Sequence, residues 1–265
     1  MRVLKSEANL ETITLYPLGD WHLGSEHCDI KTIERQLEEI KHDKTARIIL
    51  MGDLAETATK ESVGAGVYEQ EQNAQQQMMR VKNLLHPYRN IIDGVVTGNH
   101  EERIYKQSGF DLSLYLCQLL DLEPKYMRYQ GVVGYVIGKR SFLVNVWHGA
   151  GGGGSAGASL NKLQKQSEYV LADIYLMGHV HKRQVHTKQM MIPNPKYEKK
   201  EVIMQYFVAT GSSLDYENSY AESAGMSPSQ KGFTKIRMWT EFQQTEEARE
   251  RQKRIEVIIF KMSIL

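Results

Sequence analysis

The chain has 265 residues, of which 41% are hydrophobic and 25% charged, and its formal net charge is +1. This composition fits a globular protein with one large core, and we expect a single domain over residues 1–265. The near-zero net charge excludes an overall electrostatic field that would recruit nucleic acid or membrane. The chain has only two cysteines, Cys28 and Cys117, which argues against a disulfide framework. No segment has the length and apolarity of a signal peptide or a membrane span. We therefore expect a cytoplasmic protein without a membrane partner.

The first elements predict a β-loop-α-β succession. Residues 12–18 and 47–51 are apolar runs typical of buried strands, and apolar residues in 30–41 recur at the spacing of an amphipathic helix. A strand, a helix and a second strand in this order favour a parallel pair with a crossover helix. The polar segment 57–66 is expected to be a loop.

The middle of the chain continues this alternation. A helix is predicted over 68–85, where His86-Pro87 ends it, a strand over 91–97 and a buried helix over 112–122. Two apolar runs at 132–137 and 142–147 flank Gly138-Lys139-Arg140-Ser141, which predicts a hairpin.

Further strands are expected in the last third. A glycine-rich segment over 149–157 precedes a predicted helix over 159–171 and a strand over 173–177. Later strands are predicted at 202–210, 233–242 and 255–264, and the polar segment 215–231 between them is expected to be a loop. The charged segment 243–254 is either a solvated helix or a mobile excursion. The motif-bearing core therefore covers about 12–210, and 233–265 adds strands and a charged excursion.

Five short polar segments follow these apolar runs in order, and most stand where a predicted strand ends. They are Gly19-Asp20-Trp21-His22, Gly52-Asp53, Gly98-Asn99-His100-Glu101, His148-Gly149 and Gly178-His179-Val180-His181. An α/β protein delivers its functional side chains at the carboxyl ends of its strands. Each segment alone is more often a simple turn or a structural histidine, so the prediction depends on all five together.

Imidazole, carboxylate and amide oxygen are the ligands that divalent transition ions take in proteins. Asp20 and His22 are two positions apart, as are His179 and His181, and each pair can converge on one ion if its loop bends. The two oxygens of Asp53 can bridge two ions. A two-ion centre suits a phosphate ester, whose displacement it clamps at both the entering and the leaving oxygen.

Three other residues complete the expected centre. Asn99 offers a neutral amide oxygen, and His148 completes the coordination of the second ion. His100 stands next to a ligand but is left over, and it can protonate the leaving oxygen or donate a hydrogen bond to the phosphoryl group.

The five segments resemble the motifs of the calcineurin-like metallophosphoesterase superfamily, which read D-x-H, G-D, G-N-H-D/E, H and G-H-x-H. The likeness covers about positions 13–181 and agrees in both order and spacing. It implies a four-layer α/β/β/α sandwich of two mixed β-sheets with helices outside, and an enzyme that hydrolyses phosphate esters with a metal-bridging hydroxide as nucleophile.

Carried over by position, the resemblance also implies the ligand sets. The first ion is expected to be held by Asp20, His22, Asp53 and His181. The second is expected to be held by Asp53, Asn99, His148 and His179. His100 is then the catalytic histidine. The ions of the family are manganese, which we expect here, or iron, zinc or nickel.

Departures from the pattern narrow the subfamily. No arginine follows Gly52-Asp53 in the manner of protein Ser/Thr phosphatases, and no tyrosine stands near Asp53 as in purple acid phosphatases. The form Asp20-Trp21-His22-Leu23-Gly24 is more similar to the bacterial repair exonuclease branch and to small phage-encoded members. This favours a phosphodiester, such as a nucleotide or DNA, as substrate. The alternatives are a phosphomonoesterase of the same superfamily and a non-catalytic metal-binding scaffold.

Several residues outside the ligand set have two readings each. Gly149 and Gly151 belong to a loop that either cradles phosphate or only connects two elements, and Arg103 and Lys182 either contact the substrate or are solvated charges. Trp21 either stacks on a base or, as we favour, packs on a neighbouring strand. The segment Met190-Met191-Ile192-Pro193 is expected to be a loop that packs on the core.

Overall fold

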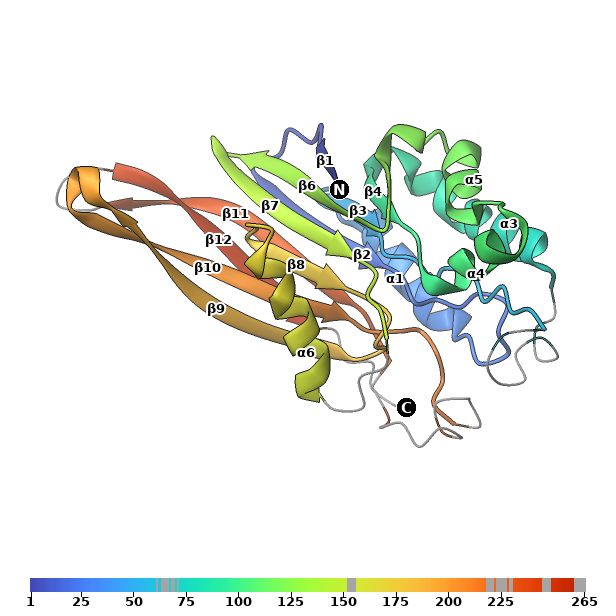
Figure 1. Cartoon of the computed structure of the whole chain (residues 1–265). Coiled ribbons are helices and arrows are strands. Elements are labelled where there is room, and N and C mark those ends of the chain that lie inside the picture. Colours follow the sequence, from blue (N-terminus) through green and yellow to red (C-terminus); the bar gives the residue numbers. More distant parts are fainter. Residues whose placement is uncertain are drawn as a thin grey trace.

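Two mixed six-stranded β-sheets form the centre of the molecule in this computed structural model (Figure 1). The structure describes residues 1–60, 62, 67, 70, 72–151, 156–217, 222, 228, 231–244 and 249–259. Within these residues, no helix is long and apolar enough to cross a membrane.

The first sheet has the order β12-β11-β2-β3-β4-β5. Its inner strands β2, β3 and β4 pair in parallel with one another, whereas β11 is antiparallel to β2. This confirms the predicted parallel pair around the crossover helix α1. The strands are β2 Thr12–Leu18, β3 Ala46–Leu50, β4 Ile92–Val96, β5 Tyr126–Arg128, β11 Thr234–Gln244 and β12 Arg249–Ile259.

The second sheet has the order β1-β6-β7-β8-β10-β9. The predicted hairpin is present, because β6 and β7 pair antiparallel around Gly138 and Lys139. The strands are β1 Arg2–Lys5, β6 Gln130–Ile137, β7 Arg140–Trp147, β8 Ile174–Met177, β9 Arg183–Asn194 and β10 Lys199–Thr210.

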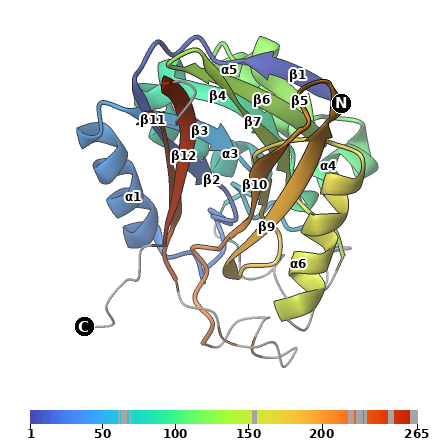
Figure 2. The same ribbon diagram turned by 90° about the vertical axis from the view of Figure 1, so that its left-hand side faces the viewer.

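Helices cover the outer faces of both sheets, so the chain has the predicted four layers. Figure 2 shows α1 and α6 on opposite sides of the paired sheets. The α-helices are α1 Ile30–His42, α3 Ala74–Leu85, α4 Asn99–Ser108, α5 Leu112–Leu119 and α6 Ala156–Lys165. Short 3-10 helices are η1 His86–Ile91, η2 Glu123–Lys125, η3 Gln166–Glu168 and η4 Pro195–Tyr197.

Alternation along the strands explains why each sheet is buried on both faces. Ile13 and Leu15 of β2 point into the core between the two sheets, and the neighbouring Tyr16 and Leu18 point into the core under the helices. Successive side chains of a strand face opposite sides, so an apolar run of this kind fits a strand covered on both faces. A smaller cluster around Phe207 lies on the other outer face with Leu163 of α6.

The described helices differ from the sequence prediction in several places: the helix expected over 112–122 ends at Leu119, and α4 is not among the predicted helices. The helix expected over 68–85 begins only at Ala74, because Asn73 forms a capping box with Gln76. The helix expected over 159–171 is α6 with a short η3, and it ends at Glu168. Residues 152–155 of the glycine-rich segment, and most of the segment 215–231, lie outside the described residues.

Two predictions for the last third are wrong. The segment 190–193 is part of strand β9, not a loop on the core, and Met191 is 67% exposed. The helix considered for 243–254 is absent where the segment is described, because Gln243 and Gln244 end β11 and Arg249 begins β12. These parts of the strands extend beyond the core in long hairpins, so they lack the buried apolar stripe by which a strand is recognised.

Candidate metal centre

All five polar segments meet at one edge of the two sheets. Asp20 and Asp53 follow β2 and β3, Asn99 begins α4 directly after β4, and His148 and His179 follow β7 and β8. Because parallel strands end at the same edge of a sheet, and the two sheets face one another, the segments converge although they are far apart in the chain.

The backbone at these strand ends is unusual. Five predicted ligands have a positive φ, which side chains other than glycine seldom adopt: Asp20 at 50°, His22 at 50°, Asp53 at 50°, His179 at 64° and His181 at 53°. Strained conformations of this kind cluster at functional sites, where the surrounding structure holds them. The bend supplied at each strand end lets residues two positions apart point at one place.

Two glycines of the motifs are required by close approach. A Cβ at Gly98 would lie 2.1 Å from Asp53 Oδ1, and a Cβ at Gly178 would lie 2.5 Å from Asp20 Oδ2. The carboxylates of Asp20 and Asp53 therefore pack directly against glycine backbone. This explains why glycine precedes Asn99 and His179.

The side chains form two groups that can each hold a metal ion. Asp20, His22 and His181 make the first group, and Asp53, His148 and His179 make the second. In the first, His22 Nε2 and His181 Nε2 lie 3.1 Å apart, and His181 Nε2 lies 3.4 Å from Asp20 Oδ1. Two imidazole nitrogens bound to one zinc-like ion at about 2.1 Å each stand at about this separation, so the donor set fits an ion.

The second group contains Asn99 as well. Asn99 Oδ1 lies 2.7 Å from His179 Nδ1 and 3.1 Å from His148 Nε2. His148 Nε2 is in turn 3.2 Å from Asp53 Oδ2. A third group joins Asp53 to His22 and His100, so Asp53 lies between the ligands of the two sites.

Hydrogen bonds fix which nitrogen each histidine presents. The Nδ1 of His148 donates to the Met51 carbonyl oxygen at 2.7 Å, which leaves Nε2 as the ligand atom. His22 Nδ1 lies 3.1 Å from Glu56 Oε2, and its Nε2 faces the first group. Partners of this kind orient metal-binding histidines and select their tautomer.

Burial favours the neutral form of two ligands. It lowers the pKa of His22, with His100 as the next contribution, and it lowers the pKa of His179, with His148 as the next. Neutral imidazole is the form that binds a metal. Both histidines are therefore ready to coordinate near neutral pH.

Glu56 is a functional candidate that the sequence analysis did not identify. Its Oε2 lies 3.4 Å from His100 Nδ1, which also lies 2.8 Å from the Glu56 carbonyl oxygen. Burial alone would raise the pKa of Glu56, but hydrogen bonds from His100 and His22 hold it well below its usual range. Glu56 stands in a loop without periodicity, and only its place three residues after Asp53 could have pointed to it.

The charge on Glu56 acts on His100. Burial lowers the pKa of His100, but the carboxylates of Asp53 and Glu56 outweigh it and raise that pKa to about 9. His100 Nε2 lies 3.9 Å from Asp53 Oδ2. The structure thus brings His100 to the ligands as a histidine that holds its proton.

Glu101, named in the motif but given no role by the sequence, fastens two loops together. Its buried carboxylate accepts hydrogen bonds from the backbone N–H groups of Asp53 at 2.9 Å, Leu54 at 2.8 Å, Ala55 at 3.2 Å and Gly98 at 3.1 Å. It therefore holds the Asp53 loop against the start of α4, which carries Asn99 and His100.

The residues considered for substrate contact lie around this centre. Arg103 donates to Ser62 Oγ at 2.9 Å and lies 3.8 Å from Glu56. Gly149 has a φ of 113°, and a Cβ there would lie 2.9 Å from His179 Cβ. Gly151 accepts a hydrogen bond from Lys162 of α6 at 2.9 Å, and Lys182 is half-buried beside His181. Trp21 is fully buried, so the packing alternative holds and it does not stack on a base.

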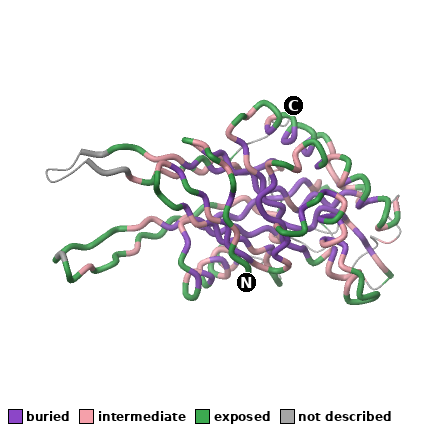
Figure 3. Tube along the Cα trace, turned by 90° about the horizontal axis from the view of Figure 1, so that it is seen from above, coloured by how far each residue is buried: buried purple, intermediate pink, exposed green. Residues whose placement is uncertain are grey.

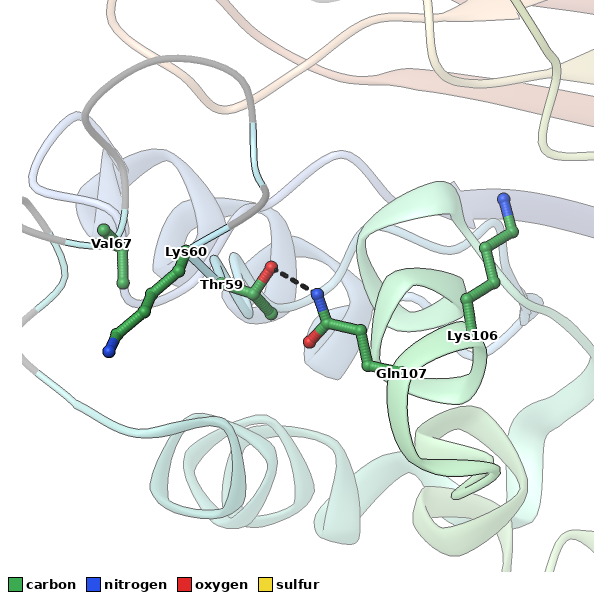
Figure 4. A pocket seen from close by; sticks show the side chains of 5 residues that line it. All are labelled: Thr59, Lys60, Val67, Lys106 and Gln107. Atoms are coloured by element: carbon green, nitrogen blue, oxygen red, sulfur yellow. Dashed lines mark hydrogen bonds between the residues drawn. The ribbon is translucent and has the colours of Figure 1, made fainter.

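A hollow of about 660 Å³ lies next to α4 and is lined by Thr59, Lys60, Val67, Lys106 and Gln107. Gln107 donates to Thr59 Oγ1 at 2.9 Å across it (Figure 4). The ammonium groups of Lys60 and Lys106 point away from each other in this view. The hollow therefore offers no converging pair of cations.

Comparison with known proteins finds no family model that matches the chain and no curated protein that matches it.

The solved structures that are similar to the chain include three from different organisms. One is a conserved uncharacterized protein of Streptococcus pneumoniae described as a predicted phosphoesterase. It is 12% identical, the match covers 92% of this chain and 99% of that chain, and the TM-score is 0.38. A protein serine/threonine phosphatase of Saccharomyces cerevisiae, described as similar to human phosphatase PP5, has 12% identity over 99% of this chain and 84% of that chain, with a TM-score of 0.38. A hypothetical protein of Thermus thermophilus has 13% identity over 94% and 99%, with a TM-score of 0.35. Likeness of this extent assigns no activity, so the function is argued from the site itself.

Proposed function

We propose that this protein is a metal-dependent hydrolase of phosphate esters with a two-ion centre, and that phosphodiesters are its preferred substrates. The observation that carries the proposal is the position of Asp53, whose carboxylate is shared between a group with His22 and a group with His148 and His179. Two ions at such a centre supply a water of lowered pKa and the positive charge that an in-line displacement at phosphorus requires.

The residues of the chain then have separate tasks. Asp20, His22 and His181 hold the first ion with Asp53, and Asn99, His148 and His179 hold the second with Asp53. Manganese fits this mixed nitrogen and oxygen donor set, as do iron, zinc and nickel.

His100 donates the proton to the leaving oxygen. Its Nδ1 is held by Glu56, its Nε2 is on the side of Asp53, and its raised pKa keeps it protonated near neutral pH. A general acid of this kind contributes about 10²- to 10⁴-fold to a rate. Arg103, Gly149, Gly151 and Lys182 line the surroundings and are proposed to contact the rest of the substrate.

The preference for diesters is proposed from the first segment, Asp20-Trp21-His22-Leu23-Gly24, which resembles the bacterial repair exonuclease branch. Steady-state turnover of bis-p-nitrophenyl phosphate and p-nitrophenyl phosphate, measured with each metal in turn, tests the class and the preference together. No turnover of either ester by the metal-loaded protein would leave the non-catalytic scaffold as the better account.

Two variants test the assigned roles. We expect His100→Ala to lower kcat for a dinucleotide phosphodiester, whose alkoxide leaving oxygen needs a proton, by about 10²-fold or more while both ions remain bound, and to change the turnover of bis-p-nitrophenyl phosphate much less. We expect Asp53→Asn to reduce the occupancy of both ions, measured by elemental analysis after dialysis. Full occupancy in Asp53→Asn would contradict the shared position of this carboxylate.

A further inference from the structure

The β9–β10 hairpin is a two-stranded ribbon that leaves the body of the protein. β10 pairs with β8 only over Tyr206–Ala209, whereas its pairing with β9 extends over the whole hairpin, from Thr210 opposite Arg183 to Lys199 opposite Asn194. Figure 3 shows it projecting beyond the buried core, and β9 is mostly exposed along its length. An isolated two-stranded ribbon is at best marginally stable in water, so the outer part of this one, beyond its pairing with β8, stands out as a feature with little support from the core.

The ribbon begins at the metal centre. β9 starts two residues after His181, and β10 ends just before Ser212, whose hydroxyl donates to the Asp20 carbonyl oxygen at 3.0 Å. Twelve residues of β-strand extend about 40 Å. The ribbon therefore offers a continuous exposed surface from the candidate active site to its own tip.

Positive charge is concentrated on this surface. Residues 182–210 contain six lysines and arginines against two glutamates, a surplus of four, whereas the whole chain has a net charge of only +1. The rest of the chain is therefore anionic on balance. Four exposed lysines lie on the hairpin: Lys188 in the middle of β9, Lys196 at the tip, and Lys199 and Lys200 at the start of β10.

Apolar side chains accompany the outer lysines near the tip on both faces of the ribbon. Met191 and Val202 lie with Lys200 on one face, and Ile192 lies with Lys199 on the other. Met191 is 67% exposed, Val202 51% and Ile192 37%. Cations together with exposed methionine and isoleucine on a narrow ribbon match the chemistry of a nucleic-acid groove, which admits a two-stranded β-ribbon and takes phosphate contacts from lysine and apolar contacts to sugars and bases.

We propose that the β9–β10 hairpin is a binding arm for duplex DNA, whose groove takes in the ribbon so that lysines on both of its faces reach the phosphates on either side. The inference rests on the proposed function, because it names the phosphodiester substrate of the same site. A second copy of this chain is the competing occupant, since exposed Met191 and Val202 also suit a protein interface. The surplus of like charge disfavours two such arms side by side.

The test uses the metal-loaded full chain and a 30-base-pair phosphorothioate duplex that resists hydrolysis. We expect K188Q/K196Q/K199Q/K200Q to weaken binding, measured by fluorescence anisotropy, by at least 10-fold. The slope of log K against log salt concentration should flatten by about 3 to 4, since each lost phosphate contact removes about 0.9. The control K31Q/K41Q/K44Q/K139Q changes the net charge equally at four exposed lysines of the body and should keep the wild-type slope.

Equal loss of affinity in both quadruple variants would overturn the proposal, because a non-specific charge effect would then explain the binding. So would a dimer, detected by light scattering, that Met191→Ser dissociates while the K188Q/K196Q/K199Q/K200Q variant binds the duplex as wild type does. If no ester is hydrolysed but K188Q/K196Q/K199Q/K200Q alone loses DNA affinity, the DNA-binding proposal is supported and the catalytic proposal is wrong. If bis-p-nitrophenyl phosphate is hydrolysed and the ribbon variant keeps its DNA affinity, the arm fails and the catalytic proposal stands.

Discussion

Glu56 holds His100 through two contacts at the same nitrogen, since His100 Nδ1 lies 2.8 Å from the Glu56 carbonyl oxygen and 3.4 Å from its carboxylate. The pair fixes both the direction of the imidazole ring and its proton. The Glu56 carboxylate thus orients the imidazole of the proposed acid catalyst, as hydrogen-bond partners orient the imidazoles of metal-binding histidines.

The first prediction concerns this pair. Glu56→Gln keeps the size of the side chain and removes its charge, so the pKa of His100 should fall and less of it should carry a proton above neutral pH. We expect kcat for a dinucleotide phosphodiester, whose alkoxide leaving oxygen needs a proton, to drop by about 10²-fold and the alkaline limb of its pH profile to move to lower pH. A reduced kcat with an unmoved alkaline limb would show that Glu56 acts only through its contact with His22. Glu38→Gln, on the exposed face of α1, is the control.

The second prediction concerns the glycine before Asn99. In Gly98→Ala the added methyl group would meet Asp53 Oδ1 at 2.1 Å, so the shared carboxylate has to move. We expect loss of at least one ion per chain by elemental analysis, and loss of most activity. Gly134→Ala is a matched control in β6, because its nearest neighbours would lie at 3.6 Å. Two tightly bound ions in Gly98→Ala would show that Asp53 tolerates displacement.

The third prediction is a pH dependence of stability in metal-free protein. Burial lowers the pKa of His148, but Asp53 outweighs it and raises that pKa to about 10, while the pKa of His100 is raised to about 9. In the unfolded chain histidine titrates near about 6.5. The stabilisation is therefore complete below that pH and is lost as pH rises toward 9 and 10.

Calorimetry with and without metal checks this sign. The Tm of the metal-free protein should fall between pH 7 and 10, and the gain in Tm on adding metal should grow over the same range, because ions bind neutral imidazole. A metal-free Tm that rises from pH 7 to 10 would contradict the protonated state assigned to His148 and His100.

The fourth prediction concerns stability away from the site. Asp93 of β4 is buried, pairs with Arg47 through both guanidinium contacts and accepts from Ser6 Oγ at 2.9 Å. Asp93→Asn leaves the Arg47 charge buried without its partner. Breaking a buried pair costs about 3 kcal/mol or more, which corresponds to a drop in Tm of about 6–12 °C in denaturation scans. A drop of less than about 2 °C would mean that water reaches Arg47 well enough to replace the carboxylate.

The sequence predicted which candidate ligands lie together, because each one is marked locally. An apolar run, a glycine and a polar residue identify the end of a strand, and the order of five such ends was enough to place Asp20, Asp53, Asn99, His148 and His179 at one edge. The roles of Glu56 and Glu101 were not predictable in this way, since each acts on partners that only the folded chain brings near.

Strand β9, in contrast, could not be recognised as a strand from the sequence over residues 190–193. Its apolar residues at 190–192 are consecutive, do not alternate, and face water, so nothing in their pattern distinguishes a projecting ribbon from a loop. Apolar and polar residues alternate along a strand when one of its faces is buried. A strand with both faces exposed shows no such alternation. The same reasoning explains why the charged start of β12 resembled a solvated segment.

His22 and His181, whose Nε2 atoms stand 3.1 Å apart, are separated by 159 positions of the chain and follow strands of different sheets. A ribosome that has made the first 150 residues has not yet produced His179 and His181, so each of the two proposed ligand sets is incomplete at that stage. If the proposed ions bind, both sets are complete only after the two sheets have come together.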